Sequence, residues 1–178
     1  MRLFGILMVL MFSMSCTDTL ETSTIDGKKV DLSKGKSALV WLAPDCPLCQ
    51  SYSASFVELK NQYGDQISFY GVIPGNYYSK NEIDFFIDSF AFTPDIIADK
   101  DFKLTQSIGA TVTPEFFLLD SGMQVKYRGK FDDWATDLSR KKLKPTKHYF
   151  KNAIEALSID SPISIQSTTP IGCVIEFE

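Results

Sequence analysis

Short apolar runs alternate with amphipathic stretches over most of the chain. Each apolar run is typical of a buried strand, and each stretch between them repeats its apolar residues at helical spacing. The predicted strands span 37–42, 67–73, 95–98, 115–119 and 125–128, and the predicted helices span 50–63, 82–90, 102–108 and 147–157. Strands that alternate with helices favour a parallel sheet, and the turn at 120–122 adds an antiparallel hairpin. The pattern therefore predicts an α/β fold in which helices flank both faces of a central mixed sheet, preceded by a small hairpin around Asp26-Gly27.

The N-terminal segment has the features of a secretory signal peptide. Residues 1–15 carry Arg2 ahead of an apolar run that is too short to span a bilayer as a helix. Ser15 directly precedes Cys16, which resembles the lipobox of bacterial lipoproteins, where the cysteine becomes the lipidated N-terminus. Ser13 stands where such motifs usually have Leu. We predict lipidation of Cys16, with a cleaved soluble form and an uncleaved anchor as alternatives.

The rest of the chain fits one domain with short extensions. We expect a lipidated tether over 16–24, a folded domain over 25–160 and a tail over 161–178 that contains Cys173. An exported lipoprotein would lie in the cell envelope, facing the periplasm or in the outer membrane, with its lipid in the membrane. The formal net charge of -4 argues against nucleic acid as a partner.

The cysteines indicate chemistry rather than a disulfide scaffold, because 178 residues can bury a core without cross-links. Cys46-Pro47-Leu48-Cys49 follows a predicted buried strand and opens a predicted helix. Unpaired N–H groups at a helix N-terminus favour a thiolate over a thiol. We therefore predict that Cys46 is a nucleophile and that Cys49, three residues on, is its resolving partner. Pro47 suits the first helical position, where no N–H is needed.

The same cysteines leave other readings open. Thiolates bind Cu(I) well, so a copper site could use Cys46 and Cys49 together with Cys173 or His148. The pair could also be two inert buried thiols. Cys173 itself is either a third redox cysteine or metal ligand that reaches back to the dithiol, or a tail cysteine without a partner.

A second signal is Thr113-Pro114, which stands directly before the predicted strand 115–119. Proline has no N–H to give to a sheet and is confined to strand starts and edges. Its occurrence after an upstream cysteine pair at a strand–helix junction is more specific than either motif alone.

Together these motifs resemble the thioredoxin-like superfamily, especially the TlpA-like and peroxiredoxin-like (AhpC/TSA-type) redoxins of exported bacterial proteins. The segments that carry the resemblance are WLAPDCPLCQSY at 41–52, TPEFFLLD at 113–120, YRGKFDD at 127–133 and PIGCVI at 170–175. The resemblance implies a thioredoxin-like fold in which Pro114 is cis and packs against the dithiol. It also implies that the backbone of Thr113 binds a substrate peptide. We expect Trp41 and Pro114 to shape an apolar rim around the sulfur atoms.

The chain departs from this pattern at three places. Leu39 and Ala43 occupy the positions that activate peroxide in peroxiredoxins, so peroxidase activity is not expected. Val40 replaces the buried Asp that many thioredoxins place under the dithiol, and Glu115 is the candidate substitute as proton acceptor. The alternative for Glu115 is an ordinary exposed carboxylate at a strand end. Asp45 would disfavour the neighbouring thiolate through like charge.

The expected activity is thiol–disulfide exchange. Cys46 would attack the disulfide of a protein substrate, Cys49 would release the reduced product, and no cofactor would be required. The resemblance favours a reductant that receives electrons from a donor in the envelope. The alternatives are a copper-binding module and a redox-inactive lipoprotein that serves as an interaction platform.

Overall fold

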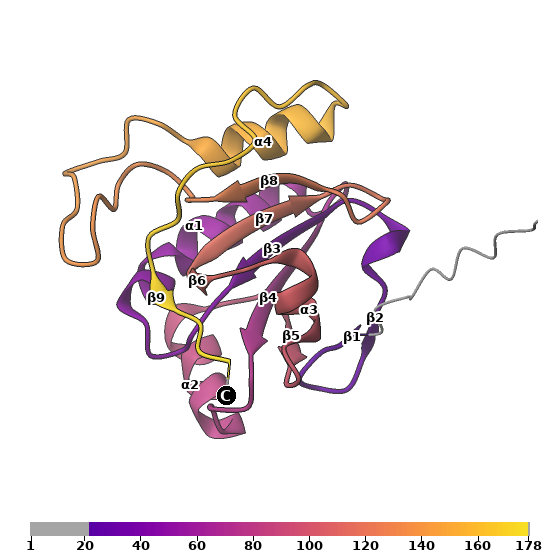
Figure 1. The fold of residues 1–178 in the computed structure, drawn as a ribbon, viewed down its shortest axis with the longest axis vertical. Helices are drawn as coiled ribbons and strands as arrows, with labels where there is room; N and C mark the ends of the chain where they lie inside the picture. Colours follow the sequence, from indigo (N-terminus) through magenta and orange to yellow (C-terminus); the bar gives the residue numbers. More distant parts are fainter. Residues whose placement is uncertain (1–21, 178) are drawn as a thin grey trace, which may run out of the picture.

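Figure 1 shows the computed structural model, which describes residues 22–177. The predicted signal peptide at 1–15 and the predicted lipidation site at Cys16 lie outside these residues. Within the described part of the chain, no helix is long and apolar enough to cross a membrane.

Five strands form the central sheet, in the order β5-β4-β3-β7-β8. Their bounds are β3 Ser37–Trp41, β4 Ser68–Pro74, β5 Asp95–Asp99, β7 Glu115–Leu119 and β8 Val125–Gly129. The strands β3, β4 and β5 run parallel, whereas β7 is antiparallel to β3 and β8 is antiparallel to β7. The mixed sheet expected from the sequence is therefore confirmed.

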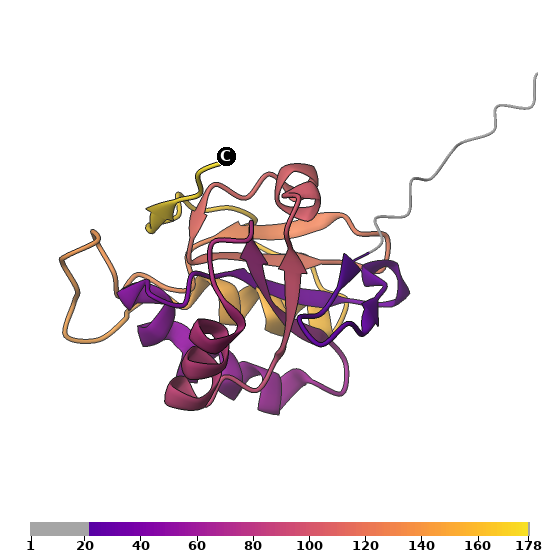
Figure 2. The same ribbon diagram turned by 90° about the horizontal axis from the view of Figure 1, so that it is seen from below.

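Helices cover both faces of this sheet (Figure 2). Their bounds are α1 Pro47–Tyr63, α2 Lys80–Phe90, α3 Lys103–Ile108 and α4 Tyr149–Ser158, with a short 3₁₀ turn, η1, at Leu32–Lys34. Residues of α1, α2 and α4 pack with Val40 and Leu42, whereas α3 packs with Leu39 and Trp41 on the other face. Successive side chains of β3 thus point to opposite faces, as the geometry of a strand requires.

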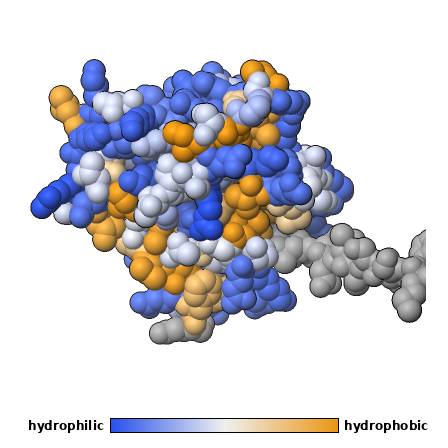
Figure 3. All heavy atoms as spheres, turned by 45° about the horizontal axis from the view of Figure 1, so that its top comes forward, coloured by the Kyte–Doolittle hydropathy of each residue, from blue (hydrophilic) through white to orange (hydrophobic). Residues whose placement is uncertain are grey.

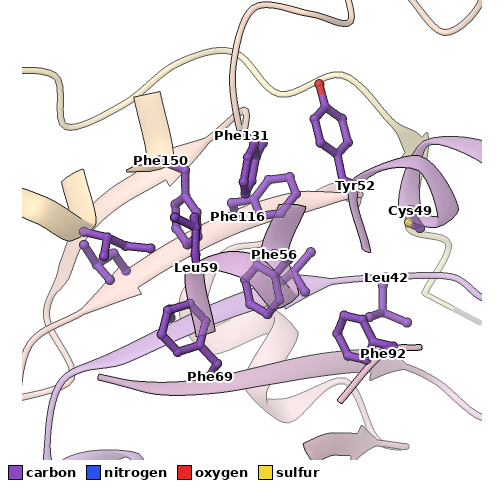
Figure 4. Packing of buried hydrophobic residues seen from close by; sticks show 14 of the residues in the cluster. Leu42, Cys49, Tyr52, Phe56, Leu59, Phe69, Phe92, Phe116, Phe131 and Phe150 are labelled. Carbon is purple, nitrogen blue, oxygen red and sulfur yellow. The ribbon is translucent and has the colours of Figure 1, made fainter. Parts of the chain in front are cut away.

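Aromatic rings fill the hydrophobic cluster under α1 (Figure 4). Phe56 of α1 stacks on Phe92 and Phe150, with ring centroids 6.0 and 6.1 Å apart. Phe116 of β7 contacts Phe150 at 5.3 Å. Cys49 lies at one end of this cluster (Figure 4). Because the rings hold α1 against β7 and α4, the first turn of α1 is fixed relative to the end of the sheet.

A small hairpin precedes the sheet. Strand β1 (Thr22–Ser23) pairs antiparallel with β2 (Lys29–Val30), and Gly27 takes a φ of 81° in the turn. Thr24 is buried and forms an isolated bridge to β5. The predicted hairpin is present, and the packed structure begins inside the segment 16–24 that was predicted to be a tether.

The C-terminal segment returns along the edge of the sheet (Figure 1). Arg128 of β8 donates its N–H to the carbonyl of Gln166 and accepts from the N–H of Thr168, both at 3.0 Å. This pairing covers backbone groups that an edge strand otherwise exposes. Gly129 allows the close approach, because a Cβ there would lie within 3.0 Å of the Thr168 backbone.

Beyond this edge, the chain forms a last short strand. Strand β9 (Cys173–Val174) pairs antiparallel with β6 (Val112–Thr113), directly before β7. The next residue, Ile175, is buried in the cluster on the α3 face. The segment 161–177, predicted to be a tail, is thus packed on the domain.

The outer surface carries no broad hydrophobic area on the side shown in Figure 3. Polar residues cover most of that side, and hydrophobic residues form several separate patches.

Candidate active site

The dithiol lies at the start of α1. Cys46 is the N-cap residue of this helix and Pro47 is its first residue, as predicted. Both Cys46 and Cys49 are buried, each with 4% of its surface exposed. The N-cap position brings the Cys46 sulfur beside backbone N–H groups that have no partner within the helix.

Hydrogen bonds stabilise the thiolate of Cys46. They lower its pKa from 9.0 to about 6, and the largest cause is a side-chain hydrogen bond from Cys49. Burial opposes this shift, while the backbone N–H groups of Cys49 and Leu48 and the thiol of Cys173 add to it. The thiolate is therefore the favoured form of Cys46 at neutral pH.

The second thiol is held in the opposite state. Burial raises the pKa of Cys49 well above 9.0, and the hydrogen bond and negative charge of Cys46 raise it further. The backbone N–H of Ala43 donates to the Cys49 sulfur at 3.4 Å. One sulfur is thus ready to attack while the other keeps its proton.

The loop before β7 lies over the dithiol. The Thr113–Pro114 peptide bond is cis, as the resemblance implied. In its protonated form, Cys46 donates to the carbonyl oxygen of Thr113 at 3.4 Å. Pro114 and Cys49 line the same small void beneath the helix. The structure therefore brings together Cys46, Cys49, Thr113 and Pro114, which the sequence places far apart.

A third sulfur completes the site. The Sγ of Cys173 lies 3.7 Å from the Sγ of Cys46, and the cysteines 46, 49 and 173 are all free thiols here. Partial burial of this otherwise exposed thiol raises the pKa of Cys173, and the charge of Cys46 contributes to the shift. The reading of Cys173 as a tail cysteine without a partner is therefore wrong.

The carboxylate of Asp45 is engaged by a neighbouring phenol. The hydroxyl of Tyr78 donates to Asp45 Oδ1 at 2.6 Å. Burial and this hydrogen bond raise the pKa of Tyr78. The charge of Asp45 still helps to raise the pKa of Cys173. The pKa of Cys46, the residue next to Asp45, is nevertheless lowered by the hydrogen bonds that Cys46 accepts.

Trp41 does not shape the rim of the site, contrary to the sequence-based expectation. Its side chain is fully buried on the α3 face, where its Nε1 donates to Thr105 Oγ1 at 2.8 Å and its ring meets Phe117 edge-on. The reason is the alternation along β3, which directs Leu42 rather than Trp41 toward the dithiol.

Glu115 faces away from the sulfurs for the same reason. It lies opposite Trp41 in the β3–β7 pair and is fully buried. One carboxylate oxygen accepts from Arg128 at 2.9 Å, and the other accepts from the N–H of Thr111 at 2.8 Å. Both readings from the sequence need correction: the carboxylate is not exposed, and its partners belong to the loop before Pro114 and to β8 rather than to the dithiol.

A metal site gains no support from the arrangement. Within residues 22–177, no group of three or more His, Cys, Asp or Glu side chains is placed to hold a metal ion. His148 is exposed at the N-cap of α4. It thus belongs to the start of a helix on the surface, whereas the three thiols meet at the start of α1.

One residue of the site was missed in the sequence. Gly172 packs against the Thr113–Pro114 peptide so closely that a Cβ would lie within 3.0 Å of the Thr113 carbonyl group. The signal was present, because Gly172 is the glycine of the PIGCVI segment and directly precedes Cys173.

A cavity of about 320 Å³ opens beside the sulfurs; we call it the thiol cavity. It is lined by Cys46, Pro47, Tyr78, Thr113 and residues 173–176. A larger cavity of about 620 Å³ lies between β1 and the start of α3, and no cysteine lines it. The thiol cavity is the one that can place a substrate on the nucleophile.

Solved structures share this architecture, although no protein-family model and no curated protein matches the chain. An uncharacterized conserved protein from Geobacillus kaustophilus has a TM-score of 0.77 and 21% identity, over 89% of this chain and 88% of that one. A secreted disulfide oxidoreductase from Mycobacterium tuberculosis, homologous to DsbE, has a TM-score of 0.55 and 13% identity, over 80% and 96%. The exposed lipoprotein thioredoxin of Streptococcus pneumoniae has a TM-score of 0.57 and 17% identity, over 79% and 97%.

Proposed function

We propose that this chain, which has the thioredoxin-like fold of these structures, is a thiol-disulfide oxidoreductase of the cell envelope that reduces protein disulfides. The observation that carries the proposal is the division of roles between two buried thiols. The pKa of Cys46 is lowered to about 6, whereas burial raises that of Cys49. Thiol–disulfide exchange needs a thiolate to attack and a second thiol to complete the reaction.

The reaction consists of two displacements. The Cys46 thiolate attacks one sulfur of the substrate disulfide, that S–S bond breaks, and the other substrate sulfur leaves and takes up a proton. Cys49 then loses its proton, attacks the Cys46 sulfur and releases the second substrate thiol. The substrate gains two electrons and two protons, and the protein is left with a Cys46–Cys49 disulfide. A dithiol donor must reduce this disulfide before the next cycle.

The charge on Cys46 determines when Cys49 can be deprotonated for the second displacement. The negative charge on Cys46 is one cause of the raised pKa of Cys49. The mixed disulfide removes this charge, so Cys49 becomes easier to deprotonate once the substrate is attached. Cys49 is therefore activated after the first displacement rather than before it.

The location in the envelope rests on the N-terminal segment and on the neighbours. The sequence of 1–16 is typical of a lipidated export signal. Among the similar structures, one protein is described as secreted and another as an exposed lipoprotein. In this proposal a lipid on Cys16 holds the domain at a membrane, close to a membrane-bound electron donor.

The test is reduction of insulin disulfides by dithiothreitol with the full chain as catalyst. We expect Cys46→Ser to lower the rate to that of dithiothreitol alone, because the pKa values of the other two thiols at the site, Cys49 and Cys173, are raised. Cys16→Ser is the matched control and should keep the wild-type rate. Unchanged activity of Cys46→Ser would reject the proposed function.

A second measurement addresses copper binding through the same cysteines. Protein purified under reducing conditions is incubated with Cu(I) and then with a competing thiol. Under the redox proposal the copper is lost to the competitor. Retention of one copper per chain by the wild type but not by Cys46→Ser would instead favour a metal-binding role.

A further inference from the structure

We propose that Cys173 is a third redox cysteine, which strand β9 holds in the thiol cavity so that it forms a disulfide with Cys46. This inference rests on the proposed dithiol exchange and gives its nucleophile a second partner within the chain. The site then has two alternative oxidised states, one with a Cys46–Cys49 bond and one with a Cys46–Cys173 bond.

The distance between the sulfurs supports this pairing. The Cys46 and Cys173 Sγ atoms are 3.7 Å apart, which is van der Waals contact. A disulfide bond of about 2.05 Å would need a movement of less than ~2 Å, within reach of a side-chain rotation. Cys173 is exposed, whereas only 4% of Cys46 is accessible. Cys173 therefore stands between solvent and the nucleophile.

The backbone of β9 lies where an extended substrate would bind. Thr113 pairs with Cys173, and Val112 pairs with Val174, in antiparallel register. An extended peptide that adds to this short strand would use the same backbone groups. Strand β9 therefore occupies the position of a bound substrate peptide and places Cys173 beside Cys46; we call it an internal substrate strand.

Gly172 adapts the chain to this position. A side chain at this residue would collide with the carbonyl group of Thr113. The absence of a Cβ lets the backbone pass over the cis peptide and places the next residue, Cys173, beside the nucleophile. A tail that only covered the surface would not need so close an approach.

Contacts beyond β9 hold it in register. The N–H of Ile175 donates to the Thr111 carbonyl at 3.0 Å, and its side chain is buried. Tyr77 donates to the carbonyl of Glu176 at 3.2 Å. These contacts hold the residues that follow β9 against Thr111 and Tyr77. Cys173 is therefore kept near Cys46 by the fold.

The chemistry balances with a substrate disulfide as the oxidant. After Cys46 has formed the mixed disulfide, Cys173 loses its proton and attacks the Cys46 sulfur. The bond between Cys46 and the substrate breaks, and the substrate leaves as a thiol. The thiolate of Cys49 then attacks the same sulfur and releases Cys173 as a thiol, without further change in oxidation state. Since the charge of Cys46 raises the pKa of Cys173, forming the mixed disulfide also favours its deprotonation.

The experiment uses full chains that carry Cys16→Ser and Cys49→Ser, so that Cys46 and Cys173 are the only thiols. The protein is mixed with oxidised glutathione, quenched over time, alkylated in denaturant and examined by intact mass and peptide mapping. We expect glutathione to add to Cys46 and then to be displaced, leaving a Cys46–Cys173 disulfide in the monomer. The matched control adds Cys173→Ser and should stop at the glutathione adduct.

A second pair of variants tests the role of the strand. Gly172→Ala in the same background should slow formation of the Cys46–Cys173 bond at least tenfold. Gly35→Ala is its control, because a Cβ at Gly35 meets nothing within 4 Å, and it should leave the rate unchanged.

The outcomes separate this inference from the proposed function. A stable glutathione adduct on Cys46 with Cys173 still free would overturn the inference and leave the dithiol exchange intact. Cys46 remaining a free thiol, bound neither to glutathione nor to Cys173, would overturn both. An equal rate in Gly172→Ala and Gly35→Ala would show that β9 does not guide the closure and would reject the internal substrate strand.

Discussion

At the scale of the residue, hydrogen bonds outweigh burial at Cys46. A buried thiolate is unfavourable in itself, yet the thiol of Cys49 and two backbone N–H groups lower the pKa of Cys46 to about 6. At Cys49 burial outweighs the one backbone N–H donor, that of Ala43, and the pKa rises. Neighbours only three residues apart therefore take opposite protonation states.

This difference predicts how alkylation depends on pH. The rate of carbamidomethylation of Cys46 by iodoacetamide follows its thiolate fraction, so it should rise with pH, reach half its maximum near pH 6 and level off above pH 7. Mass spectrometry of the modified peptide gives the rate. In Cys49→Ala the midpoint should move upward, because the largest cause of the low pKa is removed. A wild-type midpoint near 8.5, the value of a free thiol, would contradict the assignment.

The sequence was sufficient for the dithiol because its chemistry depends on local position. A cysteine that follows a strand and opens a helix lies beside free N–H groups whatever the rest of the fold does. The roles of Trp41 and Glu115 could not be read in this way. Every residue of β3 and β7 is buried, so no alternation of polar and apolar residues in the sequence shows which face each side chain takes.

At the scale of the element, an ion pair joins β7 to β8 next to the active-site loop. Arg128 binds the buried carboxylate of Glu115 and also the carbonyl of Gly109, which precedes the loop at 110–114. Its guanidinium lies 5.3 Å from the centre of the Phe117 ring. The pair therefore ties the loop that carries the cis proline to the edge strand.

Replacement of Arg128 should destabilise the fold. Arg128→Leu leaves the Glu115 carboxylate buried without its cation, and we expect the free energy of unfolding in urea to fall by about 2 kcal/mol. This is below the cost for a fully buried pair because 38% of the Arg128 side chain is exposed. Lys126→Leu, on the same strand and paired with Asp120, whose side chain is 26% exposed rather than fully buried, should change it by less than ~0.5 kcal/mol. Equal effects of the two substitutions would contradict the importance of the buried pair.

The larger elements and the hairpin of β1 and β2 were predictable, but the pairing of β6 with β9 was not. All five strands of the central sheet and all four α-helices agree with the hydrophobic pattern to within a few residues. Strands β6 and β9 have two residues each, too few for any periodicity. Their pairing joins segments about sixty residues apart, and only the packed fold decides it. The sequence alone therefore leaves open whether Cys173 reaches the dithiol.

At the scale of the whole molecule, the C-terminal segment is part of the fold. It pairs with the free edge of β8, covers the nucleophile and adds Ile175 to the core. Removing it would uncover an edge strand, a reactive sulfur and an apolar pocket at once. The C-terminal segment thus stabilises the fold and also limits access of solvent to Cys46.

Truncation measures both contributions. A chain that ends at Asp160 should lose about 3 kcal/mol of unfolding free energy, from the buried Ile175 and the lost backbone pairing. Cys46 should also react faster with iodoacetamide at pH 7. A chain that ends at Ile175 keeps these contacts and serves as the control. Equal stability and equal Cys46 reactivity in the chains that end at Asp160 and at Ile175 would show that the C-terminal segment contributes neither to stability nor to protection of Cys46.

The alternation along β3 also decides what optical spectroscopy can detect. The chain has two tryptophans, and the indole of Trp41 is sealed on the side of the sheet away from the sulfurs. Trp134 lies on the dithiol side, with its ring 5.5 Å from that of Tyr52. We therefore expect a change in tryptophan emission on oxidation to originate from Trp134, with Trp41 as the background against which such a change can be read.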